Sequence, residues 1–396
     1  MLRPDSLGLL LLLGLCAGLL PLGTDTYLPA LPTIAAELAA PSVLVQATMG
    51  GFIAAFGLAQ VFAGPLADRY GRRPLLIGGL LVFALASLGA AAAPDIEWLI
   101  AARIGQAFGA CCGLVVGRAA IRDLFDRETG ARKLARMSAV SVCVPLAMPP
   151  IGGLVLVLLG WRAIFVLLAA IGFALALWAR QGFAETLPRR DPAALDFVRL
   201  RTAAGVILGT PSFLGHALGL ACGYAGLFCF LSGSSFVLIG QLGIAPSQYG
   251  FAISSLALTH FVSTLTAARL VPRFGSPRLF AWGVAWMAAM GATMALGIGL
   301  FGPSLASVMP PMLAFMIGLA VAIPQGPALA LAAIPPSIAG TASALIGLLQ
   351  MTLAALASLV VALAGDGSAQ PMALGIAASA LVGLLAYRLV IGRHSP

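Results

Sequence analysis

Charged side chains are scarce in this sequence: Asp, Glu, Lys and Arg together make up 9% of its 396 residues, whereas hydrophobic residues make up 61%. A water-soluble protein surrounds its apolar core with a polar surface, and this composition supplies too little charge for one. Lipid must therefore be the solvent for most of the surface. The scarcity of charge excludes an ordinary soluble enzyme or binding domain.

Sequence motifs of catalytic and metal sites are also missing. The chain has no HExxH, no GxSxG and no phosphate-binding loop. Its six cysteines show no CxxC spacing and no flanking histidine that would complete a metal site. No long polar stretch provides a soluble catalytic or sensory domain. We therefore expect neither an enzyme nor a receptor, and neither a metal nor a cofactor.

The net charge of +9 raises the question of nucleic-acid binding. Proteins that bind nucleic acids gather their basic residues in one patch, whereas here these residues fall in short clusters between apolar runs. Such clusters are the topology signals of membrane proteins. We therefore expect a lipid bilayer as the partner of this charge, and no nucleic acid.

Apolar runs of the length of a membrane span recur along the chain. A spanning helix needs about 20 apolar residues at 1.5 Å per residue. The first run leads into Thr24 and Asp25 without the small-residue cleavage site of a signal peptide, so we count it as a helix. Twelve runs bounded by charge, Pro or Gly are expected to span the membrane: 7–29, 43–63, 74–93, 97–121, 134–159, 163–180, 204–239, 249–270, 277–299, 304–330, 338–364 and 370–391.

The positions of the basic residues predict the orientation. Cytoplasmic loops are enriched in Lys and Arg, and a cytoplasmic N-terminus places nearly all basic residues of the connections on the cytoplasmic side. Both termini are therefore predicted to be cytoplasmic. The residues that face inward are Arg69, Arg72, Arg73, Arg122, Arg127, Arg132, Lys133, Arg136, Arg180, Arg189, Arg190, Arg199, Arg201, Arg269, Arg273, Arg278, Arg388 and Arg393, whereas the other side carries Arg162 with Glu37, Asp95, Glu97 and Asp366.

The longest polar interruption, at 181–202, reads as a cytoplasmic linker because it contains prolines and several arginines. It separates six predicted helices in residues 1–180 from six more in residues 203–396. A faint repeat supports the division, since DRYGRRP at 68–74 has a shortened echo in PRFGSP at 272–277. The predicted fold is an all-α membrane protein with twelve transmembrane helices in two pseudo-symmetric six-helix bundles.

The sharpest local signal is GPLADRYGRRP at 64–74, between the second and third predicted helices. Gly71 permits a tight turn, and Asp68 can accept hydrogen bonds from N–H groups at a helix N-terminus, such as that of the eleventh predicted helix. An ordinary basic loop is the alternative. The segment resembles the complete first signature of the major facilitator superfamily, which implies a gating role for Gly64, Asp68, Arg69, Gly71, Arg72 and Arg73.

Further segments resemble the Bcr/CflA drug-resistance subfamily. They are GTDTYLPALP at 23–32, RAAIRDLF at 118–125, GWR at 160–162, ETLP at 185–188, and AGTASAL at 339–345 with Gln350. This resemblance spans the whole chain. It implies export of antibiotics such as bicyclomycin or chloramphenicol-type phenicols across a bacterial inner membrane, driven by inward proton flow. It also places Arg118, Arg122 and Asp123, at the end of the fourth helix, in a conformational motif.

Two further segments resemble elements of the superfamily, each with one residue that differs from the family pattern. MPPIGG at 148–153 resembles the antiporter signature Gly-Pro-x-x-Gly-Gly, with methionine in place of the first glycine, and implies a gating role for Pro149, Gly152 and Gly153. Helix packing through small residues is the alternative. RIGQAFG at 103–109 resembles the superfamily's Arg-x-x-Gln-Gly-x-Gly element, with Ala107 in place of a glycine.

Asp25 and Arg103 are ionisable residues inside apolar runs. Such a group costs about 2.5–3.5 kcal/mol at the centre of a spanning helix, so the two should face a cavity or each other. A static structural ion pair is one interpretation. The resemblance favours another, because superfamily exporters place an acidic proton carrier in helix one and an arginine in helix four. Asp25 is then the coupling carboxylate, and Arg103 tunes its protonation.

Aromatic and amide side chains in the apolar runs are candidates for the wall of a drug-binding cavity. Most will be packing residues, and only those that face the centre will touch a drug. The predicted substrate-binding residues are Tyr27, Gln46, Phe52, Phe56, Gln106, Tyr224 and Phe228, with Gln60, Phe108, Phe236 and Gln325 as further candidates. We expect His216 and His260 to be structural residues and not a proton relay.

These observations predict a monomeric, proton-coupled multidrug exporter that exchanges small amphipathic molecules for protons by alternating access. The alternative is a solute uptake symporter or facilitator with the same fold. The Pro-Gly element of the fifth helix and the Asp25 region favour export.

The predicted orientation is testable with single cysteines in a chain stripped of its own six. We expect an impermeant thiol reagent added to intact cells to label Ser42→Cys and to spare Ser276→Cys, because only the first lies outside. Permeabilised cells, in which both should react, provide the control. Labelling of Ser276→Cys in intact cells would overturn the orientation.

Overall fold

The apolar runs fold into long helices, which satisfy their own backbone hydrogen bonds without water. The computed structural model describes residues 2–3, 5–192, 194, 196–365 and 368–391, and every regular element in this part of the chain is helical. The α-helices are α1 (Leu7–Ala17), α2 (Leu19–Asp25), α3 (Leu31–Glu37), α4 (Ser42–Tyr70), α5 (Arg72–Ala91), α6 (Ile96–Leu124), α7 (Arg127–Leu159), α8 (Trp161–Gly182), α9 (Phe197–Leu208), α10 (Pro211–Ser235), α11 (Pro246–Phe274), α12 (Ser276–Phe301), α13 (Leu305–Ala332), α14 (Ala339–Ala364) and α15 (Ala369–Ile391). The predicted all-α class is confirmed.

Eleven helices of the described chain are long and apolar enough to cross a membrane. A twelfth span results if the pair Leu7–Ala17 and Leu19–Glu37, bent by 46°, is counted as one. This first span is broken at Gly18, where α1 ends, and it continues through α2, a 3-10 turn at Leu28–Ala30 and α3. The prediction of twelve spans therefore holds, with the first of them interrupted.

One predicted helix was wrong. The run 204–239, expected to be one helix, is divided between α9 and α10, because Pro211 lacks a backbone N–H and begins a new helix. Beyond α10 the chain continues as a π-helical segment, Phe236–Gln241. In addition, α9 begins at Phe197, inside the segment 181–202 that was expected to be a linker.

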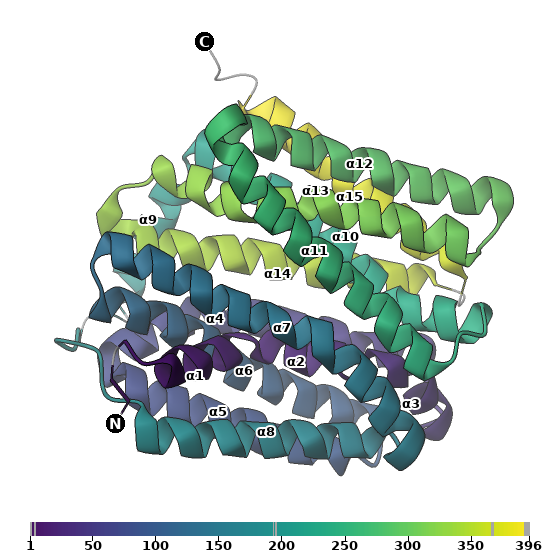
Figure 1. Ribbon diagram of the computed structural model, residues 1–396, viewed down its shortest axis with the longest axis horizontal. Coiled ribbons are helices and arrows are strands. Elements are labelled where there is room, and N and C mark those ends of the chain that lie inside the picture. The colour runs from purple at the N-terminus through teal and green to yellow at the C-terminus, as the bar shows by residue number, and fades with distance from the viewer. Residues whose placement is uncertain (1, 4, 193, 195, 366–367, 392–396) are drawn as a thin grey trace.

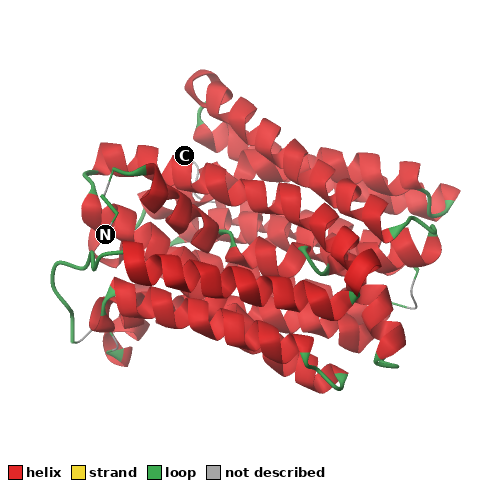
Figure 2. Cartoon of the chain, turned by 60° about the horizontal axis from the view of Figure 1, so that its bottom comes forward, coloured by secondary structure: helices red, strands yellow, loops and turns green. Residues whose placement is uncertain are grey.

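The helices form two layers that lie against each other (Figure 1). In that view α1 to α8 make the lower layer, and α10 to α15 make the upper layer. Two helix pairs join the layers: α4 packs along α14, and α7 packs along α11. Figure 2 shows from another side that most of the long helices run nearly parallel.

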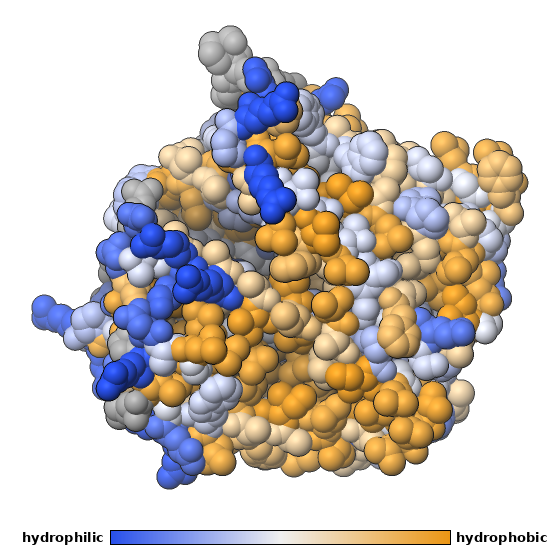
Figure 3. Space-filling model, in the orientation of Figure 1, coloured by the Kyte–Doolittle hydropathy of each residue, from blue (hydrophilic) through white to orange (hydrophobic). Residues whose placement is uncertain are grey.

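Basic side chains gather at one end of the helices. The last turns of α4, α6, α8, α11 and α15 each carry an arginine, namely Arg69, Arg122, Arg180, Arg273 and Arg388. Hydrophilic residues accordingly collect on the left of the molecule, whereas apolar residues cover most of the remaining face (Figure 3). We call this the basic end and the opposite one the far end. Arg393 and Asp366 lie outside the described residues.

At the far end, glycines bring α7 and α11 into backbone contact. A methyl group on Gly250 of α11 would lie 2.6 Å from the carbonyl oxygen of Pro149 in α7, and one on Gly153 would lie 2.6 Å from the carbonyl oxygen of Pro246. A methyl group on Gly152 would run into the carbonyl group of Thr26. Toward the basic end α7 and α11 diverge (Figure 1). The two layers therefore close at the far end through backbone contacts.

The substitution Gly250→Ala should open this closure. The added methyl group overpacks the contact with Pro149, which costs about 1–3 kcal/mol in the closed form. We expect the distance distribution between spin labels at Leu159→Cys and Gln248→Cys to shift toward longer distances. Gly50→Ala, where nothing lies within 4 Å of the added methyl group, is the matched control, and a shift of equal size in both variants would contradict the role of this contact.

Candidate functional site

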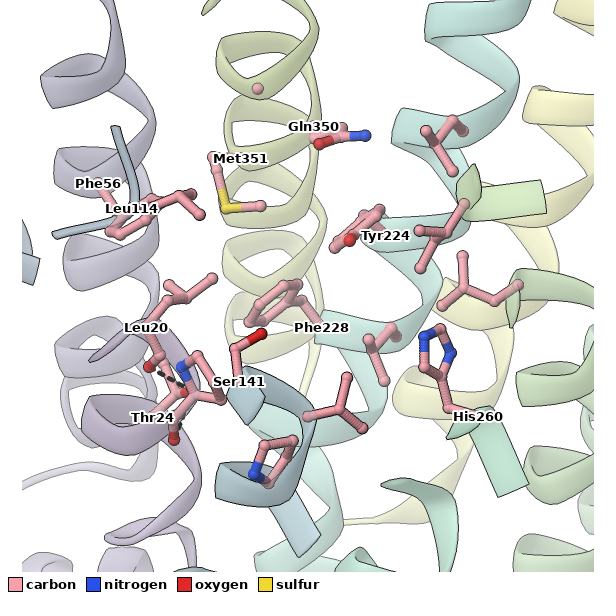
Figure 4. Close-up of a pocket in the computed structure, with 18 of the residues that line it drawn as sticks. Leu20, Thr24, Phe56, Leu114, Ser141, Tyr224, Phe228, His260, Gln350 and Met351 are labelled. Atoms are coloured by element: carbon pink, nitrogen blue, oxygen red, sulfur yellow. Dashed lines mark hydrogen bonds between the residues drawn. The ribbon is translucent and has the colours of Figure 1, made fainter. Parts of the chain in front are cut away.

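A cavity of ≈ 560 Å³ lies between the two layers. Its wall comes from α1, α2, α4, α6 and α7 on one side and from α10, α11, α13 and α14 on the other. Figure 4 shows side chains from both sides, among them Leu114, Tyr224 and His260, around one shared space. Most of the wall is apolar, and its polar members are Thr24, Asp25, Gln60, Arg118, Ser141, Tyr224, His260, Ser343 and Gln350. Such a wall suits a small amphipathic molecule.

Asp25 lines the cavity at the point where α2 ends. It is the last residue of α2, its side chain is buried, and its Oδ1 accepts a hydrogen bond of 2.7 Å from the hydroxyl of Thr24. No ion pair joins it to any residue that the structure describes. Among the described residues that line the cavity, Asp25 is the sole carboxylic acid. The expectation that it faces a cavity is therefore met.

Arg103 lies behind this wall and does not touch the cavity. It is fully buried, and its Nη1 donates to the carbonyl oxygen of Gly23 over 2.7 Å and to the side chain of Gln106. The guanidinium carbon lies 4.2 Å from the ring centroids of both Tyr27 and Phe52. Cation–π contacts and a backbone carbonyl hold this arginine in place, and Asp25 does not.

The predicted substrate-binding residues separate into two groups. Phe56, Tyr224 and Phe228 line the cavity, as does the further candidate Gln60. Tyr27, Phe52 and Gln106 surround Arg103 instead. The remaining residues Gln46, Phe108, Phe236 and Gln325 are not part of this wall, and Gln46 accepts a hydrogen bond of 3.1 Å from Ser232.

Two ionisable residues that were not predicted to bind substrate also line the cavity. Arg118, which the sequence places in a conformational motif, is one of them. Its charge inside an apolar run was a signal for a cavity position, by the same argument as for Asp25. His260 lines the cavity, and its buried Nδ1 has no hydrogen-bond partner among the described residues; the expectation that it is a structural residue stays a prediction. His216 does meet that expectation, because its Nδ1 lies 2.7 Å from the carbonyl oxygen of Ser212 and its ring packs on Phe280.

The predicted gating residues around Arg72 form one polar cluster at the basic end. The Arg72 guanidinium bridges Asp68, at 2.6 Å, and Asp123, at 2.9 Å. The Glu185 carboxylate, beyond α8, accepts backbone N–H bonds of 2.9 Å from Arg72 and 3.2 Å from Arg73. Burial acts to raise the pKa of Glu185. The hydrogen bonds from these and neighbouring backbone N–H groups outweigh that effect, so the pKa of Glu185 lies below its usual value. The cluster fastens α4, α5, α6 and the segment after α8 together.

Gly71 shapes the turn within this cluster. Its φ of 108° lies in the region that favours glycine, and a methyl group there would collide with the Glu185 carboxylate. Asp68 bonds to Arg72, and its side chain is 45% exposed. The described structure shows no hydrogen bond between the Asp68 side chain and the start of α14. That contact stays a prediction, for a form of the protein in which the basic end is closed.

The comparisons with known proteins agree with this architecture. Residues 13–358 match the family model of the Major Facilitator Superfamily. The uncharacterized MFS-type transporter YdgK of Bacillus subtilis is 35% identical over 277 residues, which cover 68% of this chain and 67% of the relative. The chloramphenicol resistance protein of Pseudomonas aeruginosa is 30% identical over 311 residues, which cover 78% and 73%. The bicyclomycin resistance protein homolog of Haemophilus influenzae is 27% identical over 267 residues, which cover 67% of each chain.

Solved structures show the same fold. A bacterial homolog of the human lysosomal transporter Spinster, in an inward-facing and occupied conformation, matches with a TM-score of 0.78 over 97% of this chain and 96% of that chain at 17% identity. The family model covers most of the sequence, and the drug-resistance relatives are those that the Bcr/CflA-like segments predicted. The chain is therefore a multi-pass membrane transporter that belongs to the major facilitator superfamily.

Proposed function

We propose that the chain exports small amphipathic antibiotics, such as phenicols or bicyclomycin, in exchange for protons. The observation that carries this proposal is the position of Asp25, a buried carboxylic acid in the wall of a largely apolar cavity. The names of the relatives in Pseudomonas aeruginosa and Haemophilus influenzae support the choice of drugs. The basic end and both termini face the cytoplasm of a bacterium, and the transporter acts as a monomer in the inner membrane.

Transport proceeds by alternating access between two six-helix bundles, residues 1–180 and 203–396, joined by the segment 181–202. In this structure the backbone contacts of Gly152, Gly153 and Gly250 close the far end. These contacts have to part before a drug can leave, and the Arg72 cluster then moves toward α14, where Asp68 meets the free N–H groups at the helix start.

Asp25 couples this movement to protons. Burial favours the neutral carboxyl group, whereas water and hydrogen-bond donors favour the carboxylate, so each opening of the cavity changes the balance. A proton that enters from outside discharges Asp25, and a drug that enters from the cytoplasm favours its release. An uptake symporter on the same fold would instead bind substrate and proton together.

Asp25→Asn should abolish proton-driven efflux and retain binding of a neutral drug, because the amide keeps the shape of the carboxyl group and cannot titrate. The decisive measurement is drug-induced proton release from detergent-purified protein. Glu97→Gln, at an exposed position near the start of α6, is the control and should release protons like the wild type. Equal release from the wild type and from Asp25→Asn would reject Asp25 as the coupling residue, and drug-induced proton uptake by the wild type would favour symport.

Arg103→Ala should reduce the efflux rate by at least about tenfold, because it removes the cation that holds Gly23 and the Tyr27 and Phe52 rings next to Asp25. Arg103→Lys should restore part of the rate, since it keeps the charge and loses the planar fork. The pH at which drug-induced proton release is half-maximal should also shift in Arg103→Ala. If the pH profile stays unchanged while the melting temperature falls, then Arg103 is a structural residue only.

A further inference from the structure

Arg118 is a cation in the cavity wall without a partner in the described part of the chain. It lies on α6 and lines the cavity, yet it forms no hydrogen bond or ion pair with any described residue. The nearest acidic residue along the chain, Asp123, is bound to Arg72 at 2.9 Å. Arg122 lies close enough to Arg118 to add positive potential. Arg118 is exposed on the open side of the cavity wall, and the described part of the chain supplies no counter-ion for its charge.

The acidic residue and the arginine of the cavity wall lie at different depths. Arg103 on α6 lies beside the segment that contains Asp25, because its side chain donates a hydrogen bond to the carbonyl oxygen of Gly23. Arg118 follows fifteen residues later on the same helix, which corresponds to about 22 Å along the axis toward the basic end. Asp25 and Arg118 are thus too far apart to neutralise each other. A molecule that enters from the basic end therefore meets Arg118 before it meets Asp25.

Polar groups from the other layer surround the same space. The phenol of Tyr224 on α10 lies within electrostatic range of Arg118. His260 on α11 contributes a buried Nδ1 that has no hydrogen-bond partner in the described part of the chain. Leu114, one turn before Arg118 on the same helix face, points into the cavity opposite Tyr224 and His260 (Figure 4). Arg118 therefore has the Tyr224 phenol near it and apolar side chains in the same wall.

We propose that Arg118, with Tyr224, forms a subsite for an acidic group, so that the preferred substrates are amphipathic molecules that carry a carboxylate. The inference rests on the proposed function and adds a substrate class to it. A guanidinium presents a planar fork that binds a carboxylate through two parallel hydrogen bonds. The carboxylate would compensate the lone charge, and the apolar part of the molecule would lie against Leu114, Phe228 and Met351, which line the same cavity.

A pair of ligands with one shared skeleton tests the subsite. Chloramphenicol is neutral, and its hemisuccinate ester carries a carboxylate at pH 7. We expect purified wild-type protein to bind the ester about tenfold more tightly in calorimetric titrations, as a charge-assisted hydrogen bond would give. In Arg118→Gln the ratio of the two affinities should fall to about one, and in Arg118→Lys, which lacks the fork, it should lie between these values.

Arg132→Gln is the matched control. It removes a positive charge from the start of α7, where the Arg132 side chain is 65% exposed and outside the cavity wall, so the tenfold preference should persist. Two results would overturn the subsite: wild-type protein that binds chloramphenicol and prefers it to the ester, or an Arg118→Gln variant in which both affinities fall by the same factor. Wild-type protein that binds neither ligand and confers no chloramphenicol resistance would reject the proposed function, and the subsite with it.

Discussion

A backbone inside a bilayer finds no water to bond with, and this constraint governs where the chain can depart from a regular helix. Among the described spans, the first is interrupted twice, at Gly18 and between α2 and α3, and residues at these interruptions, such as Leu19, Leu28 and Ala30, are fully buried between other helices. The hydroxyl group of Thr26 donates a hydrogen bond of 2.6 Å to the carbonyl oxygen of Leu22 in the preceding turn. The irregular segment is thus tolerated because protein surrounds it and one side faces a cavity.

Several functional features lie at the second interruption, where α2 ends. The end of α2 leaves the carbonyl oxygen of Gly23 available to Arg103 and places the Asp25 carboxyl group in the cavity wall. It also presents the carbonyl group of Thr26 to Gly152 of α7. The proposed proton site and the closure of the far end therefore share a segment of a few residues.

The sequence predicted the architecture well, because length and apolarity alone decide whether a helix can span lipid. It also singled out Asp25, whose charge in an apolar run is too costly for a lipid-facing position. It predicted the cavity wall less well, because an all-apolar helix has no polar face from which its orientation can be read. Tyr27 and Phe52 were therefore expected to bind substrate, whereas they enclose Arg103, and the split of 204–239 depended on the single residue Pro211.

The contact between α5 and the Glu185 carboxylate can form only late in the synthesis of the first six spans. The N-terminus of α5 has no side-chain cap of its own, and its first N–H groups bond to a residue 113 positions later in the chain. During synthesis these groups stay without this partner until the sixth spanning helix, α8, has left the ribosome. The first half of the transporter is then fastened by its own last loop, before most of the second half exists.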